Sequence, residues 1–319
     1  MNCGDTMKKE NVKIVYMGTT EFSAGILKSL INDGWNIIGL VAQADKPVGR
    51  KRELEFPATK KVAIENNIDV FQPLNIREDN AWIREKNPDL IITCAYGQIV
   101  PKAVLEVPHL KCINVHGSLL PELRGAAPIQ YAILNDLKVT GITIMEMVRK
   151  MDAGQMFAKR EVLVDNEDTS DTLFKKMETV ASSLLLEMLP DYIEGKVEGV
   201  EQDESLVTFA PSIKREEEII NWEDTKRNIY NKIRAVNSVP GAYSVLDGVS
   251  IKIWASEEVS KEYEGKCGEI VEVLKDKFIV KVKDGAIAIK ELQVAGKKKM
   301  LARDFLNGNK DLKGKIFHE

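Results

Sequence analysis

Residues 111–128 read KCINVHGSLLPELRGAAP and form the most informative stretch of the chain. The first five residues are a short apolar run, which predicts a strand buried on both faces. Gly117, Pro121 and Gly125 then mark a loop, and Pro128 suits the first turn of a following helix. This order is typical of an open α/β sheet, in which ligands bind beyond the carboxyl ends of the strands.

Asn114 and His116 fall at the carboxyl end of this predicted strand. Residues two apart on a strand point the same way, so an amide and an imidazole can converge on one substrate atom. Asp152 follows another predicted strand, at 141–147, and we expect it to lie near His116 and to orient its ring. On these residues alone, a hydrogen-bonded core histidine is the favoured interpretation of His116, and Asp152 could be no more than a turn residue.

Other apolar runs of strand length alternate with helical patterns through the first two thirds of the chain. The runs are 12–18, 37–42, 89–94 and 141–147. One helical pattern follows Phe22 and stops at Gly34, and a strong amphipathic pattern begins after Thr169 and is expected to end at Pro190. Continuous apolar strands separated by helices predict a Rossmann-like α/β domain with a mostly parallel sheet, which we place at residues 8–204.

The pattern changes after about residue 205. A short helix is expected at 225–236, followed by short alternating strands separated by turns that contain Gly or Asp. The expected strands are 250–254, 268–274, 278–282 and 286–292. We therefore predict a small OB-like antiparallel β-barrel domain at residues 205–319.

The composition is that of an ordinary globular protein of 319 residues with a formal net charge of −4. Its four cysteines lack the CxxC spacing of a zinc site, and we expect no metal. We find no apolar run of membrane-spanning length and no secretory signal, so we expect a cytoplasmic protein without membrane contact. We also expect the protein to act as a monomer.

The motifs Asn-x-His, Ser-Leu-Leu-Pro, Arg-Gly-Ala-Ala-Pro-Ile and Asp-Ala-Gly occur in this order from Asn114 to Gly154. Together with Met-Gly-Thr-Thr-Glu-Phe at 17–22, they resemble the folate-dependent formyltransferase family. Thr20 stands where proline is usual, and Gly117 where alanine is commoner. The resemblance implies 10-formyltetrahydrofolate as co-substrate and no metal. It also implies catalysis by Asn114, His116 and Asp152, and a folate pocket with a wall formed by Ser118, Leu119, Leu120 and Pro121.

Two further segments resemble the branch of the family that formylates the α-amine of methionine on initiator tRNA. QADKPVGR at 43–50 resembles an inserted loop that contacts the tRNA, and IRAVNSVPGA at 233–242 resembles a signature of the second domain. Val236, Ser238 and Val239 depart from that signature. The implied tRNA-binding residues are Asp45, Lys46, Arg50, Lys51, Arg52, Lys214 and Arg215, mainly through phosphate contacts.

Three alternatives stay open at this point. The same chemistry could serve another amine, on an amino sugar or a purine precursor. A formyl-folate hydrolase would use the same three residues, with water in place of the amine. A non-catalytic RNA-binding module is a third alternative, against which the intact trio of Asn114, His116 and Asp152 argues.

Overall fold

The computed structural model describes residues 8–48 and 53–318, which divide into two compact units. The first unit contains most of the chain up to Ala210, and the second contains the rest. Two short segments that precede Ala210, Ala126–Lys138 and Val164–Leu173, belong to the second unit. The boundary expected between residues 204 and 205 stays a prediction.

A seven-stranded sheet forms the centre of the first unit, in the order β5-β2-β1-β6-β7-β8-β9. The strands from β5 to β7 pair in parallel, whereas β8 and β9 add an antiparallel edge. The expected α/β fold with a mostly parallel sheet is confirmed. In chain order, the strands are β1 Ile14–Gly18, β2 Ile37–Val41, β5 Val70–Phe71, β6 Leu90–Cys94, β7 Cys112–His116, β8 Val139–Glu146 and β9 Met156–Leu163.

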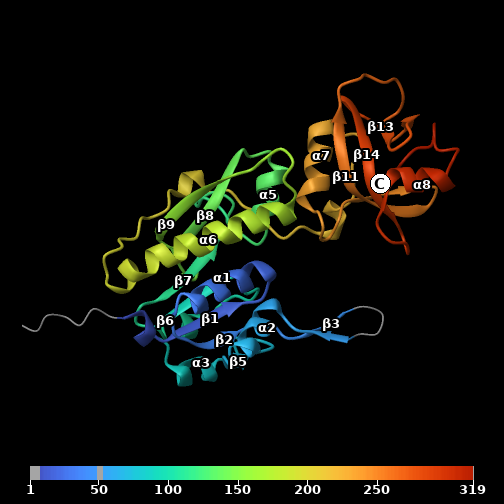
Figure 1. Ribbon diagram of the computed structural model, residues 1–319. Coiled ribbons are helices and arrows are strands. Elements are labelled where there is room, and N and C mark those ends of the chain that lie inside the picture. Colours follow the sequence, from blue (N-terminus) through green and yellow to red (C-terminus); the bar gives the residue numbers. More distant parts are fainter. Residues whose placement is uncertain (1–7, 49–52, 319) are drawn as a thin grey trace, which may run out of the picture. The chain divides into compact units, whose positions relative to one another are not determined.

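Helices cover both faces of this sheet (Figure 1). On one face, α1 (Glu21–Asn32) and α6 (Ser170–Ile193) pack together, with the rings of Phe22 and Phe174 in edge contact at 5.9 Å. On the other face, buried side chains of β1 pack with side chains from α3 (Ala81–Lys86) and α4 (Lys102–Leu105). The short helix α2, Ala58–Glu65, packs against α1.

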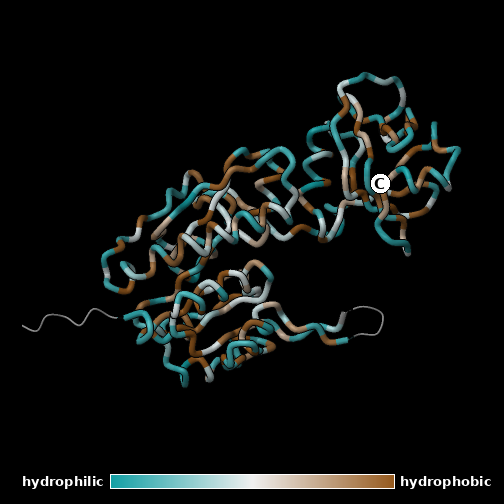
Figure 2. Tube along the Cα trace, in the orientation of Figure 1, coloured by the Kyte–Doolittle hydropathy of each residue, from teal (hydrophilic) through white to brown (hydrophobic). Residues whose placement is uncertain are grey.

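The helix α6 continues one turn beyond the expected end at Pro190, so that prediction was wrong. A proline inside a helix lacks one N–H and crowds the preceding turn. Only three residues follow Pro190 in the helix. The missing N–H therefore removes one hydrogen bond in the last turn, and the rest of the helix keeps its hydrogen bonds. Figure 2 shows hydrophilic and hydrophobic residues alternating along this helix, as expected of an amphipathic helix on a sheet.

The second unit contains a curled antiparallel sheet in the order β10-β11-β14-β13-β12, with β15 paired to β14. Its tail bridges from His318 to Val245 of β10 and from Ile316 to Glu269, just before β12, so the tail links the two edges of the sheet. This arrangement is consistent with the expected OB-like domain. Its elements are α5 Pro128–Leu134, α7 Lys226–Ala235, β10 Tyr243–Leu246, β11 Val249–Val259, β12 Ile270–Val273, β13 Phe278–Val282, β14 Gly285–Val294, β15 Met300–Leu301 and α8 Ala302–Gly308.

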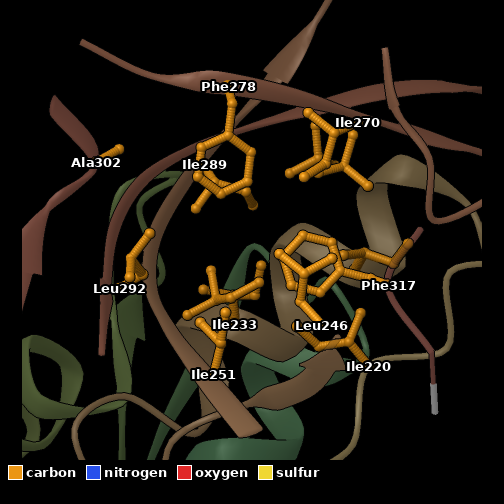
Figure 3. Close-up of a cluster of buried hydrophobic side chains, with 14 of the residues drawn as sticks. Ile220, Ile233, Leu246, Ile251, Ile270, Phe278, Ile289, Leu292, Ala302 and Phe317 are labelled. Carbon is orange, nitrogen blue, oxygen red and sulfur yellow. The ribbon is translucent and has the colours of Figure 1, made fainter. Parts of the chain in front are cut away.

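The interior of this sheet is filled by aliphatic and aromatic side chains from every side (Figure 3). Phe278 and Ile289 come from neighbouring strands, Ile233 from α7, and Phe317 from the tail. The rings of Phe278 and Phe317 stack with centroids 6.3 Å apart. Burial of such a side chain contributes about 1.5–3 kcal/mol. Because the buried Phe317 belongs to the tail, the tail is part of this core.

An ion-pair cluster ties Asp136 to α7 within the second unit. Nε of Arg227 donates to Oδ1 of Asp136 at 3.0 Å, and Nη1 of Arg227 donates to Glu258 at 3.1 Å. The hydrogen bond from Arg227 lowers the pKa of Asp136 to about 2, although partial burial opposes the shift. The folded state therefore favours the ionised carboxylate.

We expect acid to weaken the second unit through this group. The contribution is fully present above the unfolded-state pKa near 4 and is lost as pH falls towards 2. Because the Asp136 side chain is 37% exposed, solvent screening reduces the contribution to about 1 kcal/mol. Urea denaturation followed by tryptophan fluorescence should show Asp136→Asn less stable than wild type at pH 7, with the difference shrinking at pH 3. A difference that stays constant with pH would contradict this account.

Candidate active site

Asn114 and His116 lie at the carboxyl end of β7, as expected. β7 is bordered by β6 on one side and β8 on the other, with Asn114 opposite both Thr93 and Met145. Asn114 is half-buried and His116 is 5% exposed. The amide thus stands at the rim of the sheet, while the imidazole is held inside the protein.

The hydroxyl of Thr93 lies against the Asn114 amide. Oγ1 of Thr93 donates to Oδ1 of Asn114 at 2.8 Å, while the carbonyl oxygen of Ile113 and the sulfur of Met147 lie 3.2 and 2.9 Å from the same hydroxyl. With Oδ1 of Asn114 engaged, the amide nitrogen is left as the donating end. An amide held in this way can donate to a negatively charged oxygen without reorganising, which is what an oxyanion site requires.

Both ring nitrogens of His116 face oxygen acceptors. Nε2 lies 3.0 Å from the carbonyl oxygen of Leu123, which can only accept, so this nitrogen carries a proton. Nδ1 lies 3.8 Å from Oδ2 of Asp152, which is longer than a direct hydrogen bond. The structure thus brings His116 and Asp152 together, with a gap that a water in contact with both groups can bridge.

Asp152 is held in place by its own turn. Its backbone is in the left-handed region, with φ +49°, which aspartate tolerates better than most residues. Its Oδ2 accepts from the backbone N–H of Gly125 at 2.8 Å, and its side chain is 15% exposed. The carboxylate therefore faces His116 from the loop that follows β8.

The loop after β7 is tied to β8 through Thr143. Oγ1 of Thr143 donates to the carbonyl of Ser118 and accepts from the N–H of Leu120. The Ser118 hydroxyl donates to the carbonyl of Glu122 at 2.6 Å, and Leu120 packs in a small core cluster. Of the four residues predicted to line the folate pocket, only Leu119 and Pro121 keep partly exposed side chains. Their role in folate binding stays a prediction.

The residues predicted to contact RNA lie in two places. Asp45 and Lys46 stand at the start of a hairpin of β3 (Lys46–Val48) and β4 (Glu53–Glu55). Although burial opposes it, hydrogen bonds from Lys60 and Gln72 lower the pKa of Asp45, which therefore anchors the base of the hairpin. Lys46 is exposed, as are Lys214 and Arg215 in the second unit, whereas Arg50, Lys51 and Arg52 lie outside the described residues.

Neither Cys94 on β6 nor Cys112 on β7 has a thiol ready to act as a nucleophile. Burial, with a smaller contribution from Glu146, raises the pKa of Cys112 to about 12, and burial raises that of Cys94 to about 12. Within residues 8–48 and 53–318, no group of three or more His, Cys, Asp or Glu side chains could hold a metal ion. In the same ranges, no helix has the length and apolar character to cross a membrane. An amide donor, Asn114, and a histidine–carboxylate pair, His116 and Asp152, stand together at this edge of the sheet.

Residues 11–189 match the model of the formyl transferase family, and residues 212–310 match the C-terminal domain model of the same family. The chain belongs to the formyl transferase family. The methionyl-tRNA formyltransferase of Bacillus cytotoxicus is 46% identical over 302 residues, covering 94% of this chain and 96% of the relative. This formyl transferase thus matches that relative along nearly its whole length.

Two solved structures share the fold of this formyl transferase at low sequence identity. HypX from Aquifex aeolicus, in complex with tetrahydrofolic acid, is 19% identical with a TM-score of 0.65; the match covers 92% of this chain and 47% of HypX. The N-formyltransferase of Helicobacter canadensis, in complex with folinic acid and dTDP-3-aminofucose, is 18% identical with a TM-score of 0.66, covering 87% and 98%. At these identities the likeness concerns the fold alone.

Sequence reasoning missed Thr93, Leu123 and Gln202. Thr93 is a polar residue inside the apolar run 89–94, and a buried hydroxyl in such a run is expected to hydrogen-bond to a neighbouring polar group. Leu123 acts through its backbone, and Gln202, whose amide donates to the carbonyls of Asp152 and Gly154, lies in a stretch without a motif. Neither of these two residues carries a signal in the sequence.

The orientation of Asn114 leads to a prediction for its removal. Asn114→Ala is expected to lower kcat about 100-fold, because one preformed oxyanion donor is lost while the fold is kept. Asn75→Ala, which removes an exposed amide that donates to Glu78, serves as the matched control. Single-turnover formylation under saturating co-substrate measures the effect; a rate within a few-fold of wild type would rule out the donor role.

Proposed function

We propose that this formyl transferase moves the formyl group of 10-formyltetrahydrofolate to the α-amine of methionine carried by initiator tRNA. The observation that supports it most is the 46% identity to a methionyl-tRNA formyltransferase across both units. The inserted hairpin and the second unit are the parts expected to meet RNA. The reaction would serve translation initiation in the cytoplasm, and we propose that the protein acts as a monomer without a metal.

The reaction requires a place for negative charge and a route for one proton. The amine attacks the formyl carbon and a C–N bond forms, which places negative charge on the former carbonyl oxygen. The Asn114 amide is oriented by Thr93 to donate to that oxygen. The bond from the formyl carbon to N10 of the folate then breaks, so the formyl group leaves one nitrogen and joins the other.

The proton balance explains the histidine–carboxylate pair. The amine loses one proton and N10 gains one, so a single group that first takes and then returns a proton suffices. Nε2 of His116 is committed to Leu123, whereas Nδ1 faces Asp152 across 3.8 Å. A water in contact with both groups would relay the proton, and the Asp152 carboxylate would stabilise the ring while it is charged.

A direct assay tests the function. The protein is incubated with 10-formyltetrahydrofolate and either initiator or elongator methionyl-tRNA, with and without EDTA, and formyl-methionine is measured. We expect formylation of the initiator tRNA, much less of the elongator, and no effect of EDTA. Formate release without tRNA would indicate a hydrolase, and transfer to a nucleotide-linked amino sugar would indicate the alternative acceptor; either result in place of tRNA formylation overturns the proposal.

We expect Lys214 and Arg215 to contribute to tRNA affinity through phosphate contacts. The double variant Lys214→Ala/Arg215→Ala should weaken binding of any tRNA and reduce the slope of log affinity against log salt by about 1 to 2. Lys8→Ala/Lys9→Ala removes the same charge just before β1, at the amino-terminal edge of the sheet, and is the control. Filter binding from 50 to 300 mM salt measures both, and an unchanged slope in the double variant would contradict the assignment.

A further inference from the structure

Residues 200–210, which follow α6 and carry none of the motifs, contact both loops that surround His116. We call them the clamp segment. At its start, Val200 pairs with Met156, just after the Asp152 turn, through two backbone hydrogen bonds of 2.8 and 2.9 Å. Near its end, Phe209 pairs with Arg124 in the loop after β7. The clamp segment therefore spans the two loops that supply the partners of His116.

One end of the clamp segment holds the carbonyl that contacts His116. The N–H of Leu123 donates to Oγ1 of Thr208 at 2.9 Å, and the next N–H, of Arg124, donates to the carbonyl of Thr208 at 2.9 Å. Leu123 itself has φ +57°, a conformation that a leucine keeps only when its surroundings impose it. Its carbonyl oxygen is the acceptor 3.0 Å from Nε2 of His116.

The other end holds the carboxylate loop. Nε2 of Gln202 donates to the carbonyl of Asp152 and to that of Gly154, each at 2.8 Å. The amide oxygen of Gln202 accepts from Nε and Nη2 of Arg124 at 3.0 and 2.7 Å. Gln202 is 8% exposed and Arg124 1% exposed. One buried amide thus joins the Asp152 turn to the loop after β7.

Gly125 shows how closely the clamp segment approaches. Its φ is +128°, and a Cβ placed there would lie 2.5 Å from the carbonyl oxygen of Ala210. The N–H of Gly125 is also the donor to Oδ2 of Asp152. Glycine is therefore required for the clamp segment and the carboxylate to be held against the same loop.

We propose that the clamp segment positions His116 by fixing both of its partners, and that Gln202 and Thr208 are positioning residues for formyl transfer. Neither side chain hydrogen-bonds to His116 in the described structure; Thr208 acts through the Leu123 carbonyl and Gln202 through Asp152. The inference rests on the proposed function, because the rate it concerns is that of formyl transfer. A displacement of about 1 Å in a reacting group can cost up to 100-fold in rate, so loss of either anchor should slow the chemical step.

Two variants remove single anchors with little change in shape. Gln202→Glu keeps an acceptor for Arg124 but has no N–H to donate to Asp152 and Gly154, and Thr208→Val removes the acceptor for Leu123. We expect each to lower kcat about 10-fold or more, with KM for tRNA within about twofold of wild type. Thr208→Ser restores the hydroxyl and should restore kcat. Gln155→Ala removes a side-chain contact with Glu201 of the clamp segment that reaches neither partner of His116, and it should match wild type.

The nitrogen resonances of His116 distinguish positioning from general destabilisation. The chain has only three histidines, so ring ¹⁵N spectra at fixed pH can be assigned with His109→Gln and His318→Gln. Wild type should show the proton on Nε2, and both anchor variants should shift this signal while Gln155→Ala does not. Folded anchor variants with wild-type kcat, or with reduced kcat and an unchanged His116 signal, would overturn the proposal. If wild type fails to formylate tRNA, the proposed function falls, yet the His116 signal still tests the clamp segment.

Discussion

Replacing His116 with alanine is expected to lower kcat for formyl transfer by about three orders of magnitude. The ring is the one side chain at the carboxyl end of β7 that can take a proton from the amine and return one to N10. Its Nε2 is bound to the Leu123 carbonyl and its Nδ1 faces Asp152. Alanine has no group that could take over either contact or carry the proton. tRNA affinity should remain nearly unchanged, because the ring is buried.

Two further variants separate chemistry from structure in this experiment. His116→Gln can still donate to the Leu123 carbonyl but cannot relay a proton at neutral pH, so it should be as slow as His116→Ala. His109→Ala is the matched control, since His109 also faces a carboxylate, Asp89, at 3.6 Å, but its side chain is 60% exposed. Single-turnover rates and tRNA binding are measured together; turnover of His116→Ala within 10-fold of wild type would refute the mechanism.

Asp152→Asn is expected to reduce kcat by about two to three orders of magnitude. The amide oxygen of asparagine can still accept from the N–H of Gly125, so the turn should keep its conformation. The negative charge beside Nδ1 of His116 is lost, however, and the charged ring is no longer stabilised during the reaction. The defect should therefore appear in kcat rather than in KM for either substrate.

A matched substitution is available for this variant as well. Asp89 also faces a histidine and also accepts from a backbone N–H, that of Lys13, at 2.8 Å. Asp89→Asn should leave turnover unchanged, because this pair precedes β6 and β7 and lies away from their carboxyl ends. If Asp152→Asn retained most of the wild-type rate, or if both variants fell equally, the carboxylate would have no specific catalytic role.

The distance between a histidine and an aspartate does not by itself distinguish the surface pair, His109 and Asp89, from the site pair, His116 and Asp152. Their separations, 3.6 and 3.8 Å, are nearly equal. They differ in burial and in their place relative to the strands. The position of His116 at a strand end followed from the apolar run before it, and that part of the site could be predicted.

Several elements of the fold were not predictable from local pattern. The edge strand β9 alternates half-buried and exposed residues, and β10 is only four residues long, so neither gives a clear apolar run. β9 forms because it pairs with β8, and β10 because it pairs with β11, so that the backbone N–H and C=O groups of each pair are hydrogen-bonded. The end of α6 was misplaced for a related reason, since packing against the sheet outweighs the cost of one proline near its last turn.

The sequence by itself determined the alternation of buried strands and helices, the place of Asn114 and His116 on one side of a strand end, and the family. These features depend on neighbours within a few residues, whose spacing sets where side chains point. Only the tertiary structure decided that Thr93 orients the amide and that Gln202 and Thr208 hold the partners of the imidazole. These contacts join residues 21 to 85 positions apart, and which distant side chain satisfies a buried polar group depends on how the whole chain packs.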